Sequence, residues 1–177
     1  MLTEKQEKWV QNLSNESIIS IVPFDPTCND KFESVKSLIQ SKLGKQQIVE
    51  HRGASSLGIS GQDEIDIHIP VPEKNFNELI NPLGELFGPV KGHYPLERAR
   101  FNTIVDGKKI EIFIVNEESS AWLEGQKFYE YLKNNPESLE QYRILKESLN
   151  GLTTREYYRK KLEFMNEILN LSLHASN

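Results

Sequence analysis

The sequence predicts an α+β domain in which a mixed β-sheet with flanking helices is followed by a C-terminal helical cap. Two observations support this fold class. Short apolar segments bounded by turn residues occupy the first two thirds of the chain, and two of them flank Asp106-Gly107, a strong hairpin signal. The last third has helical patterns punctuated by Pro136 and Gly151. We therefore expect about four or five strands before the helical cap.

Helical and extended patterns alternate in the first half of the chain. A short polar helix is expected over residues 3–14, and a strand over 19–24 that ends at Pro23. Apolar residues then recur at helical spacing before Gly44, which predicts a helix that ends there: Phe32, Val35, Leu38, Ile39 and Leu43.

The remaining segments complete the predicted sheet and cap. Strands are expected over 47–51 and 64–71, and a helix-like segment over 75–88 is interrupted by Pro82 and Gly84. The hairpin joins 98–105 to 108–115, and three helices follow over 118–133, 137–149 and 154–172. We divide the chain into an N-terminal helical extension (1–17), a core (18–116) and a C-terminal helical region of the same domain (117–177).

Composition narrows the class of protein. A chain of 177 residues is long enough for one domain with a real core. A net charge of −5 disfavours bulk binding to nucleic acid. The single cysteine, Cys28, excludes an internal disulfide and a cysteine-rich zinc site. No apolar run approaches the roughly 20 residues of a membrane span, and the first residues lack the apolar stretch of a signal peptide. A soluble cytoplasmic protein with no membrane partner is expected.

The strand expected over 64–71 carries an acidic alternation. In the segment EIDIHI, period two places Glu64, Asp66 and His68 on one face and the three isoleucines on the other. The two carboxylates, about 7 Å apart along the strand, repel each other unless a cation lies between them. Carboxylate oxygens are preferred ligands of hard cations, so this face predicts a Mg²⁺ site, with Mn²⁺ as an alternative.

The hairpin is expected to add a third carboxylate. Its isoleucines at 110, 112 and 114 share one face, which leaves Glu111 on the other. A two-residue turn at Asp106-Gly107 places Asn102 opposite Glu111, with Arg98 and Arg100 on the same face as Glu111. We expect the three carboxyl groups within about 8 Å of one another. Such a group, with arginines beside it, suits metal-assisted phosphoryl transfer.

The loop before the acidic strand is built from small residues: Gly53, Ala54, Ser55 and Ser56. Its backbone N–H groups and hydroxyls can approach phosphate oxygens, more so if a short helix begins at Ser55 or Ser56. A bulky side chain there would hold a nucleotide away. Taken separately, an acidic alternation is more often a solvated strand face, and small-residue turns are common. Their combination in this order is more specific.

This combination resembles the nucleotidyltransferase superfamily that includes DNA polymerase beta and the aminoglycoside nucleotidyltransferases. Within it, the chain is most similar to the GrpB family over about residues 18–175. The similarity lies in PFDP (23–26), EHRGASSLGISG (50–61), KFYEYLKNNPESLEQYRILKESL (127–149) and REYYRKKLEFMNEIL (155–169). The chain departs from the family at Ala54, where serine is usual, and at Glu111, where a histidine is usual. The resemblance implies a nucleotidyltransferase-like fold and no settled activity.

The helical cap offers two lysines at positions where the family also has lysine. Both are commonly surface residues in this setting, but the resemblance makes Lys146 and Lys161 candidate phosphate ligands. On the last helix we expect the row that starts at Tyr158 to be core. Arg155 and Arg159 are expected to be solvated, and His51 and His93 to be structural because neither has a partner at zinc-ligand spacing.

Two functions from different classes follow. In the first, a nucleoside triphosphate lies over residues 53–56, Glu64 and Asp66 hold the metal, and Glu111 is a further metal ligand or the general base. A substrate hydroxyl of an unknown acceptor then attacks the α-phosphate. In the second, the same fold is a catalytically silent regulatory module that binds a nucleotide or acidic metabolite. Release of pyrophosphate would separate the two.

Overall fold

A computed structural model describes residues 1–174, which form two compact units. The sheet unit comprises Pro23–Ile59 and Asp63–Leu123. The helical unit comprises Met1–Val22, Ser60–Gln62 and the chain from Glu124 onwards. None of the helices in the described part of the chain combines the length and apolarity needed to cross a membrane.

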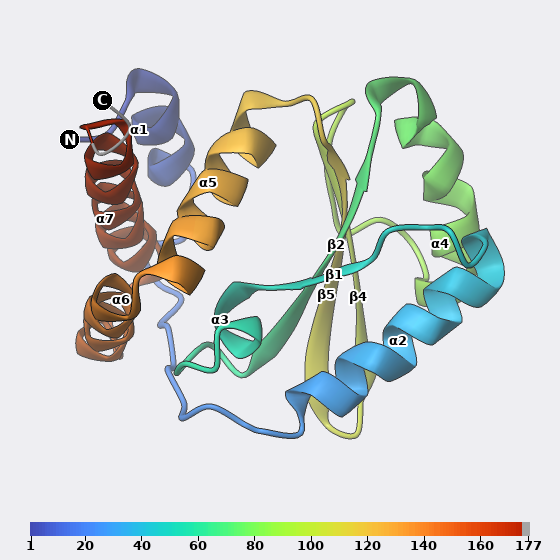
Figure 1. The fold of residues 1–177 in the computed structure, drawn as a ribbon, viewed down its shortest axis with the longest axis horizontal. Coiled ribbons are helices and arrows are strands. Elements are labelled where there is room, and N and C mark those ends of the chain that lie inside the picture. The colour runs from blue at the N-terminus through green and yellow to red at the C-terminus, as the bar shows by residue number, and fades with distance from the viewer. Residues whose placement is uncertain (175–177) are drawn as a thin grey trace. The chain divides into compact units, whose positions relative to one another are not determined.

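The sheet unit is built on five strands in the order β1-β2-β5-β4-β3 (Figure 1). Strands β2 and β5 are parallel neighbours, and every other pair is antiparallel. The expected α+β class with a mixed sheet is therefore confirmed. The bounds of the strands are β1 Glu50–Arg52, β2 Glu64–Val71, β3 Gly92–Tyr94, β4 Arg98–Val105 and β5 Lys108–Asn116.

One face of the sheet is the core. The isoleucines of β2 and β5 are completely buried there, as the period-two pattern predicts. Helices α2 (Cys28–Leu43) and α4 (Ile80–Phe87) lie on this side of the sheet (Figure 1). A short 3₁₀ helix, η1 (Glu73–Leu79), leads into α4 and buries Phe76. The opposite face carries polar side chains of the same strands together with a smaller buried cluster of Phe113, Val115 and Trp122.

The hairpin between β4 and β5 has the predicted register. Asp106 and Gly107 both adopt positive φ angles, 47° and 77°, as a two-residue hairpin turn requires. Asn102 consequently pairs with Glu111. The sequence thus predicted the course of this hairpin correctly, because an Asp-Gly turn sets the register of its two strands locally.

Other predictions of secondary structure are wrong. Residues 19–24 form no strand, and Ile18 and Val22 make only isolated bridges, to Thr153 and Gly61. Pro82 does not interrupt α4, because it lies in the first turn, where a backbone N–H has no partner within the helix. Strand β3 was not expected.

The helical unit contains α1 (Glu4–Gln11), most of α5 (Ser120–Asn134), α6 (Pro136–Ser148) and α7 (Thr154–His174). The arginines expected to be solvated instead hold the N-terminal segment. Arg159 donates two hydrogen bonds to the Glu7 carboxylate, at 2.7 and 2.8 Å, and Arg155 donates to the backbone carbonyl of Leu13.

The burial of α7 also differs from the expectation. Tyr157 and Ile168 are almost completely buried, whereas the row that starts at Tyr158 is only half-buried. The expectation that the row starting at Tyr158 is core is therefore wrong, because the side of the helix that is buried depends on which neighbours pack against it.

Candidate functional site

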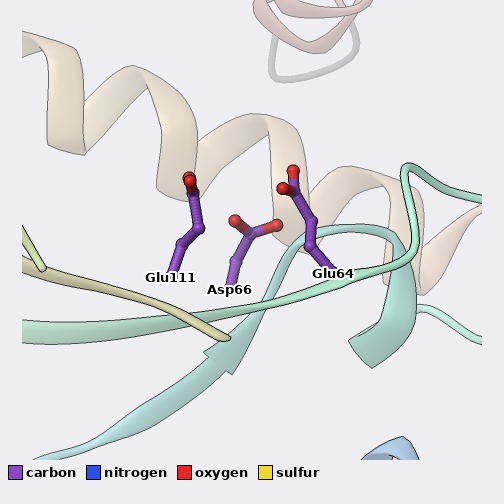
Figure 2. Close-up of side chains that lie close together, drawn as sticks. All are labelled: Glu64, Asp66 and Glu111. Atoms are coloured by element: carbon purple, nitrogen blue, oxygen red, sulfur yellow. The ribbon is translucent and has the colours of Figure 1, made fainter. Parts of the chain in front are cut away.

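Three carboxylates meet on the polar face of the sheet. One ligand oxygen from each of Glu64, Asp66 and Glu111 lies within 4.8 Å of the other two. Figure 2 shows the three side chains standing side by side and pointing the same way. Asp66 and Glu111 are direct partners in the parallel β2–β5 pair, and Glu64 lies two residues before Asp66. The expected separation of at most about 8 Å is confirmed. Among the described residues, this is the single group of three or more potential metal ligands.

Burial and rigid strands hold these carboxylates in place. Glu111 is only 7% exposed, although it is an acidic residue, and Glu64 and Asp66 are half-buried. A buried carboxylate is costly unless a positive charge or hydrogen-bond donors compensate it. The structure must therefore supply cationic partners to this group.

Lys109 is the principal cationic partner, and the sequence analysis missed it. Its Nζ lies 3.0 Å from Glu64 Oε2 and 2.6 Å from Glu111 Oε1. Burial acts to lower the pKa of Lys109, but the hydrogen bonds to Glu111 and Glu64 outweigh it and raise the pKa above its usual value. The ammonium therefore stays charged at neutral pH. The missed signal was period two, which places Lys109 on the face of Glu111.

The two arginines of β4 have different partners. Both share the face of Glu111, as predicted, but the Arg100 guanidinium lies 3.5 Å from Glu111 Oε1. The Arg98 guanidinium instead stacks over two aromatic rings, 5.2 Å from the centre of Tyr94 and 5.7 Å from that of Phe113. Arg100 is thus a cationic partner of Glu111, whereas Arg98 packs against the Tyr94 and Phe113 rings.

Gly53 brings the small-residue loop against the acidic strand. It opens the short helix α3 (Gly53–Ser56), so this helix begins earlier than the expected Ser55 or Ser56. Its φ is +71°, and a Cβ added there would lie 1.9 Å from Asp66 Oδ2. The expected reason for small residues was access for a nucleotide. The structure gives a different reason at Gly53, because any larger residue there would collide with the Asp66 side chain.

The two serines of α3 make local hydrogen bonds. Ser56 Oγ donates to the carbonyl of Gly53, at 2.9 Å, and Ser55 Oγ lies 3.0 Å from His51 Nε2. The His51 ring stacks on Phe32, with centroids 4.8 Å apart. Burial lowers the pKa of His51 to about 4, so the ring is neutral at pH 7. These contacts agree with a structural role for His51.

A second residue missed by the sequence analysis is Arg52. It is only 6% exposed and pairs in register with Asp66, so both side chains share one face of the sheet. Its guanidinium lies 5.2 Å from the centre of the Trp122 ring and 3.6 Å from Glu50 Oε2. Arg52 thus adds a positive charge to the face of the sheet that carries Asp66.

The two candidate lysines belong to the helical unit. Lys146 is only 5% exposed, which corrects the expectation of a surface lysine, and its Nζ lies 5.5 Å from the centre of the Tyr142 ring. Lys161 is half-buried, with Nζ 5.3 Å from the centre of Tyr158. Their contact with phosphate remains a prediction.

The five-stranded mixed sheet with its flanking helices makes this an α+β protein, and three carboxylates meet on one face of that sheet. The sequence matches the family described as GrpB protein over residues 18–171. The chain therefore belongs to the GrpB family. A crystal structure of the conserved protein GrpB from Enterococcus faecalis has a similar fold, with a TM-score of 0.67 and 19% sequence identity. The similarity covers 88% of this chain and 98% of the E. faecalis chain. No curated protein matches the sequence.

Proposed function

We propose that this protein is a metal-dependent nucleotidyltransferase that transfers a nucleoside monophosphate from a nucleoside triphosphate to a hydroxyl group of an unknown acceptor. The observation that carries the proposal is the convergence of three carboxylate oxygens, within 4.8 Å, from two neighbouring parallel strands. Carboxylates held by rigid strands suit a hard divalent cation.

The residues present fit a magnesium or manganese ion. Glu64, Asp66 and Glu111 would hold it, and the place of the Lys109 ammonium between Glu64 and Glu111 supports the view that a positive charge is accommodated there. Bound at these carboxylates, the ion would supply charge that stabilises phosphoryl oxygens and activates an attacking hydroxyl.

The chain's own residues would orient the reactants. Glu111, held by Lys109 and Arg100, is a metal ligand or the general base for the acceptor hydroxyl. Arg100 would spread negative charge away from the phosphoryl oxygens. The further phosphate ligands proposed within the sheet unit are Gly53, Ala54, Ser55, Ser56 and Arg98.

The test is release of pyrophosphate from labelled nucleoside triphosphates with Mg²⁺ or Mn²⁺ and a panel of hydroxyl acceptors. Release should require metal and should be lost in Asp66→Asn and Glu111→Gln. Glu78→Gln, which removes an exposed carboxylate of η1, is the matched control and should retain the activity. Release that continues at the same rate in Asp66→Asn would refute the assignment.

A catalytically silent binding module of the same fold is the second candidate. Ala54 favours it, because the hydroxyl usual in the family at this position is missing. In that case a triphosphate would bind with Mg²⁺, but no acceptor in the panel would lead to pyrophosphate release.

A further inference from the structure

Lys109 lies within the group of side chains that would hold the metal. It stands on β5 two residues before Glu111 and pairs in register with Glu64 of β2. Its ammonium reaches one oxygen of each, 3.0 Å from Glu64 Oε2 and 2.6 Å from Glu111 Oε1. Two of the three carboxylates are thereby already joined by a positive charge that belongs to the chain.

An ammonium and a metal ion would compete for these carboxylate oxygens. Mg²⁺ binds its oxygen ligands at about 2.0–2.1 Å, closer than the ammonium lies to either oxygen. Both cations on the same oxygens would be only a few ångströms apart, on a partly buried face where charges are poorly screened. Lys109 must therefore leave the oxygens that the metal takes.

The side chain of Lys109 is able to leave. It is 47% exposed, whereas those of Glu64 and Glu111 are 16% and 9% exposed. A flexible four-carbon stem lets its ammonium move into water without a change in the backbone. The carboxylates remain fixed on their strands.

We propose that Lys109 is an exchangeable counterion that determines the cation specificity of the acidic site. It bridges Glu64 and Glu111 in the metal-free protein and is displaced when a divalent cation binds. A monovalent cation that displaces Lys109 leaves the net charge of the site unchanged. A divalent cation that displaces Lys109 adds one positive charge to a site with three carboxylates. Lys109 thus makes the site selective for divalent ions and lowers its affinity for them. This inference rests on the proposed metal site.

The experiment is calorimetric titration of the metal-free full chain with Mn²⁺ alone, at a constant concentration of Na⁺. Lys109→Met should bind Mn²⁺ about tenfold more tightly than the wild type, the scale of effect seen for groups that contact metal ligands. Lys91→Met is the matched control, because it removes the same charge from an exposed position and should leave the affinity unchanged. Lys109→Arg keeps the charge in a bidentate side chain and should bind Mn²⁺ no more tightly than the wild type.

Thermal unfolding supplies a readout independent of activity. Without metal, Lys109→Met should melt at a lower temperature than Lys91→Met, because Glu64 and Glu111 lose the ammonium that bridges them and Glu111 keeps only Arg100. Saturating Mn²⁺ should raise the melting temperature of Lys109→Met by more than it raises that of the wild type. Added K⁺ should also raise the melting temperature of Lys109→Met and should have no such effect on the wild type.

The outcomes separate this inference from the proposed function. Equal or weaker Mn²⁺ affinity in folded Lys109→Met would overturn the role of Lys109 while leaving the metal site intact. If Lys109→Met does not fold, tighter Mn²⁺ binding by Lys109→Arg than by the wild type would overturn it instead. No Mn²⁺ binding by any of these proteins would overturn both the metal site and the inference.

Discussion

The close approach of Gly53 to Asp66 provides the sharpest test of how the site is built. We consider Gly53→Ala, with Gly58→Ala as its matched control. Both glycines have nearly the same positive φ, +71° and +69°, so an alanine at either position pays the same left-handed backbone cost, about 1–2 kcal/mol. They differ in what the added methyl group meets.

At Gly58 a Cβ has no neighbour within 4 Å, whereas at Gly53 it lies 1.9 Å from Asp66 Oδ2. Real Cβ contacts are essentially never shorter than 3.0 Å. The Asp66 carboxylate must therefore move by about 1 Å or more, or the loop must shift. Displacing a metal ligand or its support costs about 10–100-fold in metal affinity, which corresponds to about 1.4–2.7 kcal/mol.

Two measurements decide the case. Urea denaturation should show that Gly58→Ala loses about 1–2 kcal/mol of unfolding free energy and that Gly53→Ala loses at least as much. Calorimetry should show that Mn²⁺ affinity is unchanged in Gly58→Ala. In Gly53→Ala, Mn²⁺ affinity should fall about 10–100-fold. Equal Mn²⁺ affinity in the two variants would refute the argument that Gly53 determines the position of Asp66.

Three further predictions concern the same unit. Asp66→Asn removes one of three adjacent carboxylates, so the melting temperature of the metal-free protein should be unchanged or higher. Mn²⁺ should no longer raise that melting temperature. If the metal-free variant unfolds instead, Asp66 is a structural hydrogen-bond acceptor. Ile67→Ala truncates a completely buried side chain and should lower the unfolding free energy by about 2–5 kcal/mol in urea denaturation. Its control is Ile104→Ala, at a 72% exposed position, which should change the unfolding free energy by less than about 0.5 kcal/mol. Because the pKa of His51 is lowered to about 4 in the folded chain, only the unfolded chain takes up this proton as the pH falls from about 6.5 to 4. Stability should therefore decrease over that range by up to about 1.4 kcal/mol per pH unit, and His51→Gln should show a shallower decrease; parallel curves for the two proteins would contradict the shift.

The sequence by itself determined the acidic face. Period two assigns Glu64 and Asp66 to one side of their strand and Glu111 to one side of its own, because side chains alternate along any extended segment. The Asp106-Gly107 turn sets the register that places Asn102 and Arg100 near Glu111. These properties are local, so they could be predicted without knowing the rest of the fold.

Contacts between distant segments were decided only by the tertiary structure. The Cβ conflict between Gly53 and Asp66 depends on the path of the loop, and the bridge from Lys109 to Glu64 depends on β2 and β5 being parallel neighbours. Residues 19–24 form no strand, since their backbone pairs with the α6–α7 connection and with Gly61. The burial of Lys146 likewise follows from helix packing that its own segment does not encode. Each of these features depends on where segments far apart in the chain meet, and no local pattern of residues specifies that position.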